Sequence, residues 1–173
     1  LALIVSGVYS ILLVASRTPG INAMLPVADF FRVALVVHVD LSVLVWFLAL
    51  AGMLWSLSSR PRAPALGWLA LALACAGTAM LGIAPFAGSG SPIMANYIPV
   101  LDGGMFLYGL AVLGVAATLL VLRSLIAAPA LGMAFDGSDV LRFGLNASVI
   151  ATAVALLAFA ASLWLTPGGL DSQ

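Results

Sequence analysis

The sequence predicts an all-α integral membrane protein, a bundle of about five transmembrane helices in a single domain. The first reason is composition: 64% of the residues are hydrophobic and only 7% are charged, whereas about a quarter of an average soluble domain is charged. The second reason is the length of the apolar runs, because a membrane β-barrel would show short alternating segments instead. Mean hydropathy is +1.25.

Charge and cysteine content exclude several classes of function. The formal net charge is zero, so the chain has no basic surface of the kind that binds nucleic acid. The single cysteine, Cys75, excludes an intrachain disulfide and a cysteine-ligated metal centre. Because Cys75 lies within an apolar run, we expect its side chain to be buried and to act as a small hydrophobic group.

The first two predicted helices are separated by a short break. The apolar run Leu1–Ala15 is shorter than the ~20 residues of a full span. We expect a helix whose beginning precedes the sequence, and not a signal peptide, because no basic leader is present. After a connector at Ile21–Val27, the second span runs as one helix from about Asp29 to Ser58, with the acid near its positive end.

Three further spans follow, each bounded by Pro, Gly or polar residues. The expected order is a basic turn at Ser58–Pro64, a span at Ala65–Ala84, a long loop at Pro85–Gly104, a span at Met105–Leu125, a connector at Ala127–Ser138 and a last span to Trp164.

The arginines predict the orientation of the bundle. One side of the membrane would carry four of them, Arg60, Arg62, Arg123 and Arg142, and the other side would carry Arg17 and Arg32. The positive-inside rule places the first group in the cytoplasm. The second span then enters from outside, and His38 lies roughly 10 Å below the outer surface at 1.5 Å per residue.

The second span also holds the chemistry. His38 is the only histidine of the chain, and Asp40 follows two residues later. An ionisable residue at membrane depth is a functional-site hypothesis, and a neutral imidazole is a common ligand of haem iron. At helical steps of three or four, His38 shares a face with small residues: Ala34, Ser42, Val45, Ala49, Gly52 and Ser56. Such a face admits either a flat porphyrin or another helix, and spacing alone leaves both alternatives open.

Three neighbours of His38 have candidate roles. Asp40 points about 200° away from His38 at 100° per residue, so we expect a carboxyl group that is hydrogen-bonded elsewhere or lies on a water-filled path. Ser42, one turn from His38, is expected to contact the imidazole or its backbone. Arg32 lies near the outer end, where it would either pair with haem propionates or extend to lipid headgroups.

A family resemblance rests on the second span. The run Ala28–Arg32, the run His38–Leu41, and then Trp46 and Gly52 resemble the second transmembrane helix of haem-copper (cytochrome c) oxidase subunit I. The pattern is closer to the nitric-oxide-reductase-like members. The loop Asn96–Asp102 is similar, less specifically, to a loop of oxidase-like chains. The resemblance implies the N-terminal five-helix portion of a longer subunit, in which His38 is an axial ligand of the low-spin haem iron.

The resemblance also implies a function and partners. The low-spin haem would relay electrons from an external donor such as cytochrome c to a haem-copper oxygen-reducing centre in the respiratory chain. The further histidines of that centre are absent here, so copper would belong to the remainder of the subunit, and this chain alone would not be a complete oxidoreductase. The implied partners are the remaining helices, other oxidase subunits and the lipid of the bacterial inner (plasma) membrane.

Two other interpretations stay open. One is a small haem-b-binding membrane anchor, in which two copies share one haem through their two His38 side chains. The other is a non-redox membrane scaffold or a fragment of a transporter.

Overall fold

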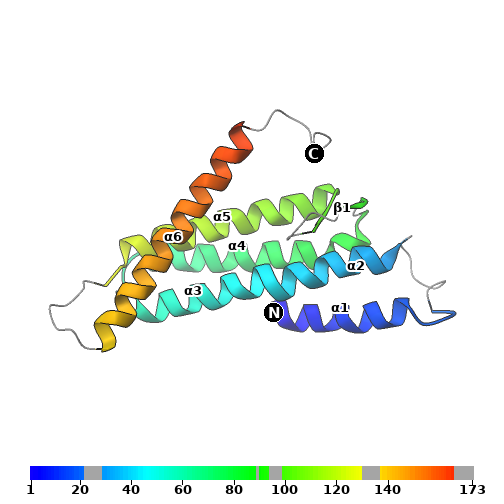
Figure 1. Cartoon of the computed structure of the whole chain (residues 1–173), viewed down its shortest axis with the longest axis horizontal. Helices are drawn as coiled ribbons and strands as arrows, with labels where there is room; N and C mark the ends of the chain where they lie inside the picture. Colours follow the sequence, from blue (N-terminus) through cyan, green and yellow to red (C-terminus); the bar gives the residue numbers. More distant parts are fainter. Residues whose placement is uncertain (22–28, 89, 94–98, 130–136, 166–173) are drawn as a thin grey trace.

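The computed structural model describes residues 1–21, 29–88, 90–93, 99–129 and 137–165. It is a bundle of long helices joined at their ends (Figure 1). The elements in chain order are α1 (Ala2–Ser16), α2 (Phe30–Val39), the π-helical segment η2 (Asp40–Val45), α3 (Trp46–Ser58), α4 (Pro64–Ile83), the short 3₁₀ turn η3 (Ala84–Phe86), β1 (Pro92–Ile93), β2 (Val100–Leu101), α5 (Gly104–Ile126) and α6 (Gly137–Leu165).

The prediction of an all-α membrane bundle is confirmed in its main feature. Within the described ranges, four helical stretches are long and apolar enough to cross a membrane: Phe30–Ser58, Pro64–Phe86, Gly104–Ile126 and Gly137–Ser162. The fifth apolar helix, α1, has 15 residues and falls short of the ~20 that a span requires. The expected connectors around 22–28 and 130–136, and the loop positions 94–98, lie outside the described residues.

The predicted long loop between the third and fourth spans contains structure of its own. Strands β1 and β2 pair antiparallel, with Pro92 opposite Leu101. Gly90 permits this approach, because its φ is +70° and an added Cβ would meet the carbonyl oxygen of Asp102. The short hairpin therefore closes one end of the bundle beside α2 and α5.

The prediction that the second span is one helix is confirmed, since Phe30–Ser58 is a continuous helical stretch. This helix is not uniformly α-helical, because Asp40–Val45 forms the π-helical segment η2. A π-helical segment bonds i to i+5 instead of i to i+4 and so widens the helix locally. Side chains beyond η2 are therefore rotated from the positions that 100° per residue predicts. This rotation separates His38 from the later residues of its predicted helix face, Val45 to Ser56.

The main core lies at the end of the bundle that contains α1 and the hairpin. Its buried side chains come from α1, α2, η2, α4, β2 and α5, among them Tyr9, Phe30, Leu41, Leu81 and Phe106. The Tyr9 hydroxyl donates a hydrogen bond of 2.6 Å to the carbonyl of Gly82, which ties α1 to α4. Cys75 does not belong to this core: it is exposed on α4, so the expectation of a buried thiol is wrong.

Helix α6 is attached mainly at one end. It crosses the bundle at an angle (Figure 1), and only 6% of its most apolar window is buried. The indole of Trp55 on α3, itself 5% exposed, donates a 2.9 Å hydrogen bond to the hydroxyl of Ser148 on α6. The remaining apolar surface of α6 is open to lipid or to other protein.

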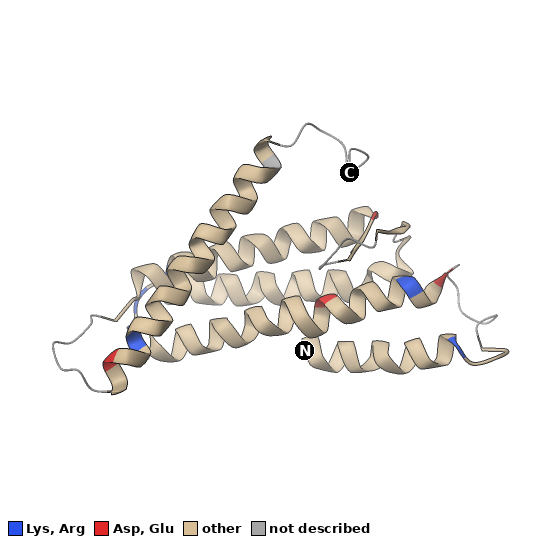
Figure 2. Cartoon of the chain, in the orientation of Figure 1, with Lys and Arg blue, Asp and Glu red and all other residues tan. Residues whose placement is uncertain are grey.

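Apart from the buried Asp40 of η2, the charged residues lie toward the two ends of the bundle, as Figure 2 shows. The turn after α3 and the end of α5 meet where the Arg60 N–H donates to the carbonyl of Ala127 at 2.8 Å. The four arginines of the predicted cytoplasmic side therefore share one end, and Arg17 and Arg32 lie at the opposite end. This separation is what the positive-inside prediction requires of the fold.

The orientation itself is open to a labelling experiment. In a Cys75→Ala background, cysteine placed at Ser91 should react with an impermeant maleimide added outside the cell, and cysteine placed at Ser59 should not. Ser91 is exposed beside the hairpin, and Ser59 lies in the turn after α3 at the arginine-rich end. Labelling of both positions after membrane disruption is the control. Reaction at Ser59 but not at Ser91 in intact cells would show the opposite orientation.

Candidate functional site

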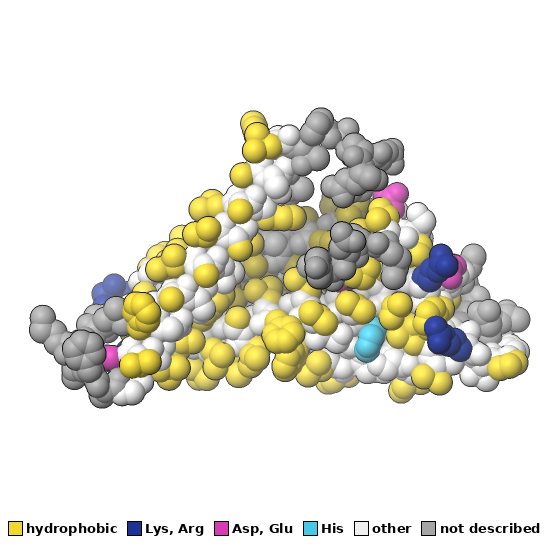
Figure 3. All heavy atoms as spheres, in the orientation of Figure 1, with side chains coloured by type: hydrophobic (Ala, Val, Ile, Leu, Met, Phe, Trp, Pro, Cys, Tyr) yellow, Lys and Arg dark blue, Asp and Glu magenta, His cyan; other side chains and the backbone are white. Residues whose placement is uncertain are grey.

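His38 packs against α1. Its Nδ1 lies 3.0 Å from the backbone carbonyl oxygen of Ser6, 2.9 Å from the Ser6 hydroxyl and 3.3 Å from the Ser10 hydroxyl. The side chain is half-buried, and Figure 3 shows the imidazole at the molecular surface among apolar side chains. One edge of the ring is thus held by α1.

The contacts of Nδ1 fix the tautomer that we assign. A carbonyl oxygen only accepts hydrogen bonds, so the Ser6 carbonyl is satisfied when Nδ1 carries the proton and donates. The Ser6 hydroxyl then donates to the His38 carbonyl at 3.3 Å, and the Ser10 hydroxyl donates to the Ser6 carbonyl at 3.3 Å. In this arrangement Nε2 keeps its lone pair, and no described residue forms a hydrogen bond with it.

Ser42 supports the backbone and not the ring. Its hydroxyl donates to the His38 carbonyl at 2.7 Å and lies 3.3 Å from the Val39 carbonyl. At a transition from α- to π-helix the bonding pattern shifts by one residue, which leaves a carbonyl in need of a donor. Of the two contacts expected for Ser42, the structure therefore has the one with the backbone of His38.

Arg32 lies in the first turn of α2 and is exposed. Its Nε lies 3.5 Å from a carboxylate oxygen of Asp29, and the two side chains are 65% and 51% exposed. Exposed ion pairs of this kind contribute little to stability, typically ~0–1 kcal/mol. The guanidinium is thus only loosely engaged, and it lies about 9 Å along the helix from His38 at 1.5 Å per residue.

Asp40 lies in the interior. It is 1% exposed, and neither carboxyl oxygen has a hydrogen-bond partner among the described residues. It does not form a hydrogen bond with the imidazole, as the angular estimate predicted, and the hydrogen bond expected elsewhere is not found among the described residues. The segment η2 that carries it packs against α1 and α4, and no donor among the described residues of these helices forms a hydrogen bond with the carboxyl group.

Because Asp40 has no hydrogen-bond partner among the described residues, removing its polarity should stabilise the fold. Asp40→Leu keeps the number of heavy side-chain atoms and should raise the free energy of unfolding by about 1–3 kcal/mol, since an unsatisfied buried polar group costs about that much. Asp40→Asn should change stability far less. Thermal unfolding in detergent measures both, with the exposed Asp29→Leu as the matched control. A loss of stability in Asp40→Leu would show that a group outside the described residues binds the carboxyl.

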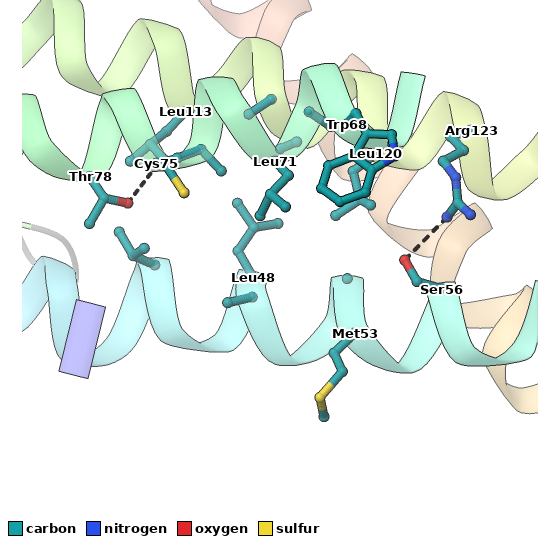
Figure 4. A pocket seen from close by; sticks show the side chains of 18 of the residues that line it. Leu48, Met53, Ser56, Trp68, Leu71, Cys75, Thr78, Leu113, Leu120 and Arg123 are labelled. Carbon is teal, nitrogen blue, oxygen red and sulfur yellow. Dashed lines mark hydrogen bonds between the residues drawn. The ribbon is translucent and has the colours of Figure 1, made fainter. Parts of the chain in front are cut away.

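The predicted small-residue face is divided between two surfaces. Four members of the face that follow His38 in the sequence line a groove of about 630 Å³ between α3, α4 and α5 (Figure 4). They are Val45, Ala49, Gly52 and Ser56. His38, Ala34 and Ser42 are not among the groove residues. The η2 register shift and the position of α1 explain the division, so a single continuous surface beside His38, as expected from spacing, is absent.

Two residues of the site were not predicted. The apolar run that contains Ser6 and Ser10 does not by itself identify them as site residues, although their spacing of four places both hydroxyls on one face of α1. A polar pair on an otherwise apolar helix was the signal that a partner lies opposite. Within the described ranges, no group of three or more His, Cys, Asp or Glu side chains could hold a metal ion, so any metal at this site depends on His38 and on ligands from elsewhere.

No family model matches the chain, and no solved structure matches it. An uncharacterised protein of Rickettsia prowazekii (strain Madrid E) is 28% identical over 143 residues, which cover 69% of this chain and 28% of that protein. The chain therefore spans less than a third of the length of the curated relative that it matches.

Proposed function

We propose that this chain is the N-terminal helical part of a haem-copper (cytochrome c) oxidase-like subunit I, and that Nε2 of His38 is an axial ligand of a low-spin haem. The observation that carries the proposal is the contact of 3.0 Å between Nδ1 of His38 and the Ser6 carbonyl. Histidines that bind metal ions usually donate from their second nitrogen to a carbonyl or carboxylate, which fixes the ring and its tautomer.

The imidazole of His38 is suited to one axial position of a haem iron. A neutral imidazole with a free Nε2 is the form that binds haem iron, and the half-buried ring is accessible from outside the bundle. The haem would supply one-electron transfer. Two residues of this chain would hold the ring: the Ser6 carbonyl would fix Nδ1, and Ser42 would support the His38 backbone.

Arg32 would serve the outer edge of this site. It lies on the same helix nearer to the membrane surface, and its exposed guanidinium can donate to a propionate in exchange for its weak pairing with Asp29. The proposal places electron entry at this end of the bundle, where an external donor such as cytochrome c would approach.

The second axial ligand and the ligands of the oxygen-reducing centre would come from other helices of the subunit. Low-spin haem needs two strong axial ligands, and this chain has one histidine. The matched relative has most of its length outside the alignment, which leaves room for such helices in a protein of that size. Copper and the second haem belong to that remainder in this proposal.

The direct test is a reduced-minus-oxidised visible spectrum of the purified full-length protein. The expected result is the sharp α-band of a low-spin haem at a stoichiometry of at least one per chain. A chain that instead binds haem only as a dimer, with half a haem per copy, would support the anchor interpretation. A spectrum without haem bands after expression with sufficient haem would refute the proposal and favour a non-redox scaffold.

A further inference from the structure

We propose that the groove between α3, α4 and α5 binds one acyl chain of an anionic phospholipid, whose phosphate pairs with Arg123. This site is separate from His38 and does not depend on the haem proposal. The groove has a volume of about 630 Å³, and its walls are mostly small or aliphatic side chains, among them Ala49, Ala74, Ala116 and Leu120. Such a surface in a bilayer fits a hydrocarbon chain better than any polar ligand.

One end of the groove is positively charged. Among the described residues that line it, Arg123 is the only one with a charged side chain, and none is acidic. Figure 4 shows its guanidinium above Ser56, to which Nη1 donates at 3.1 Å. Nε is buried and has no partner in the described part of the chain. A guanidinium has five N–H donors, so most of the hydrogen-bonding capacity of Arg123 remains for an anion.

The fold leaves space for this arginine. An added Cβ on Gly67 of α4 would lie 2.9 Å from Nε of Arg123, so a larger residue there would force the side chain to move. The Nε edge of Arg123 therefore lies against α4 at Gly67. Phosphate is a preferred partner of arginine, because the planar group matches two phosphate oxygens at once.

The groove extends along the bundle over about the thickness of one leaflet of the bilayer. Arg123 lies in the last turn of α5, at the arginine-rich end, and Trp68 near the start of α4 also lines the groove and is 72% exposed. Tryptophan and arginine are enriched at the headgroup level. From Arg123 to Leu113, deeper in the groove, the helix rises about 15 Å, which is half of a ~30 Å hydrocarbon core.

The test uses the purified full-length protein in nanodiscs of phosphatidylcholine and phosphatidylglycerol in equal amounts, with bound lipid counted by native mass spectrometry. The wild type should retain phosphatidylglycerol in preference to phosphatidylcholine. Arg123→Gln should lower that retention by about tenfold, the equivalent of roughly 1.4 kcal/mol. Arg142→Gln, whose arginine is paired with Asp139 at 3.4 Å outside the groove, is the matched control and should retain the lipid.

Two further variants separate the acyl site from simple charge attraction. Ala49→Phe places a ring in the groove and should lower lipid retention with Arg123 intact, whereas Ala72→Phe on the exposed face of α4 outside the groove should not. A photoreactive benzophenone side chain at Ala49 should cross-link to phospholipid. Cross-linking to another protein segment would show that protein occupies the groove and would overturn the proposal, as would equal lipid retention in Arg123→Gln and Arg142→Gln.

Discussion

Replacing His38 with alanine should abolish the low-spin haem spectrum of the full-length protein and leave its helices inserted in the membrane. The imidazole is the only histidine ligand that this chain can offer, and alanine supplies no lone pair to iron. Membrane insertion depends on the whole apolar stretch Phe30–Ser58, to which one side chain contributes little. The measurement is the α-band intensity per mole of protein, compared with membrane yield. His38→Met, which supplies a thioether, should retain some haem with a shifted potential.

Ser10→Ala is the matched control for the ligand assignment. The Ser10 hydroxyl lies 3.3 Å from Nδ1, but the carbonyl of Ser6 is the acceptor that holds the ring, so the haem band should persist. A normal low-spin spectrum in purified His38→Ala would contradict the assignment. In that case the contact between His38 and α1 is a helix-packing contact, which was the alternative that the small-residue spacing left open.

Replacing Gly77 with leucine should separate α4 from α5 and lower the free energy of unfolding by about 1–3 kcal/mol or more. A Cβ on Gly77 would lie 2.8 Å from Cγ of Leu113 and 3.0 Å from the carbonyl oxygen of Gly109. Backbone atoms cannot move aside unless the helices part. Gly109 faces the same crossing, since a Cβ there would lie 3.2 Å from Cβ of Met80. Close approach at small residues is a main source of helix association in membranes.

Gly114→Leu is the control for this packing prediction. Gly114 also lies in α5, but an added Cβ there would have no heavy atom within 4 Å. Both substitutions remove a helical glycine and add the same side chain, so the difference between them isolates the crossing. Thermal unfolding in detergent gives the comparison. Equal stabilities of the two variants would show that α4 and α5 do not depend on close contact at Gly77.

The helices could be predicted because the bilayer leaves few alternatives. Every backbone polar group in hydrocarbon must be bonded internally, so an apolar run of sufficient length is a helix and its breaks are turns. The expected third span, Ala65–Ala84, agrees with α4 at Pro64–Ile83, and the fourth, Met105–Leu125, agrees with α5 at Gly104–Ile126. The same argument marked Leu1–Ala15 as too short, and α1 has 15 residues.

The site could be predicted only in part. The sequence by itself determined that His38 is the single imidazole at membrane depth and that Asp40 does not orient it. The π-helical segment at Asp40–Val45 could not be predicted from the sequence. Hydropathy indicates how long a helix is, but it does not show where the hydrogen-bonding pattern shifts by one residue. A constant 100° per residue therefore placed Gly52 and Ser56 on the face of His38, whereas they line a separate groove.

The tertiary structure alone decided what the polar groups contact. Ser6 and His38 are 32 positions apart, and nothing local to either residue specifies that α1 packs against this turn of α2. The same packing buries Asp40 with no hydrogen-bond donor among the described residues. Membrane helices form from their own sequence, but their rotation and pairing come from side-chain packing between segments distant in the chain, and the candidate site is made at one of those contacts.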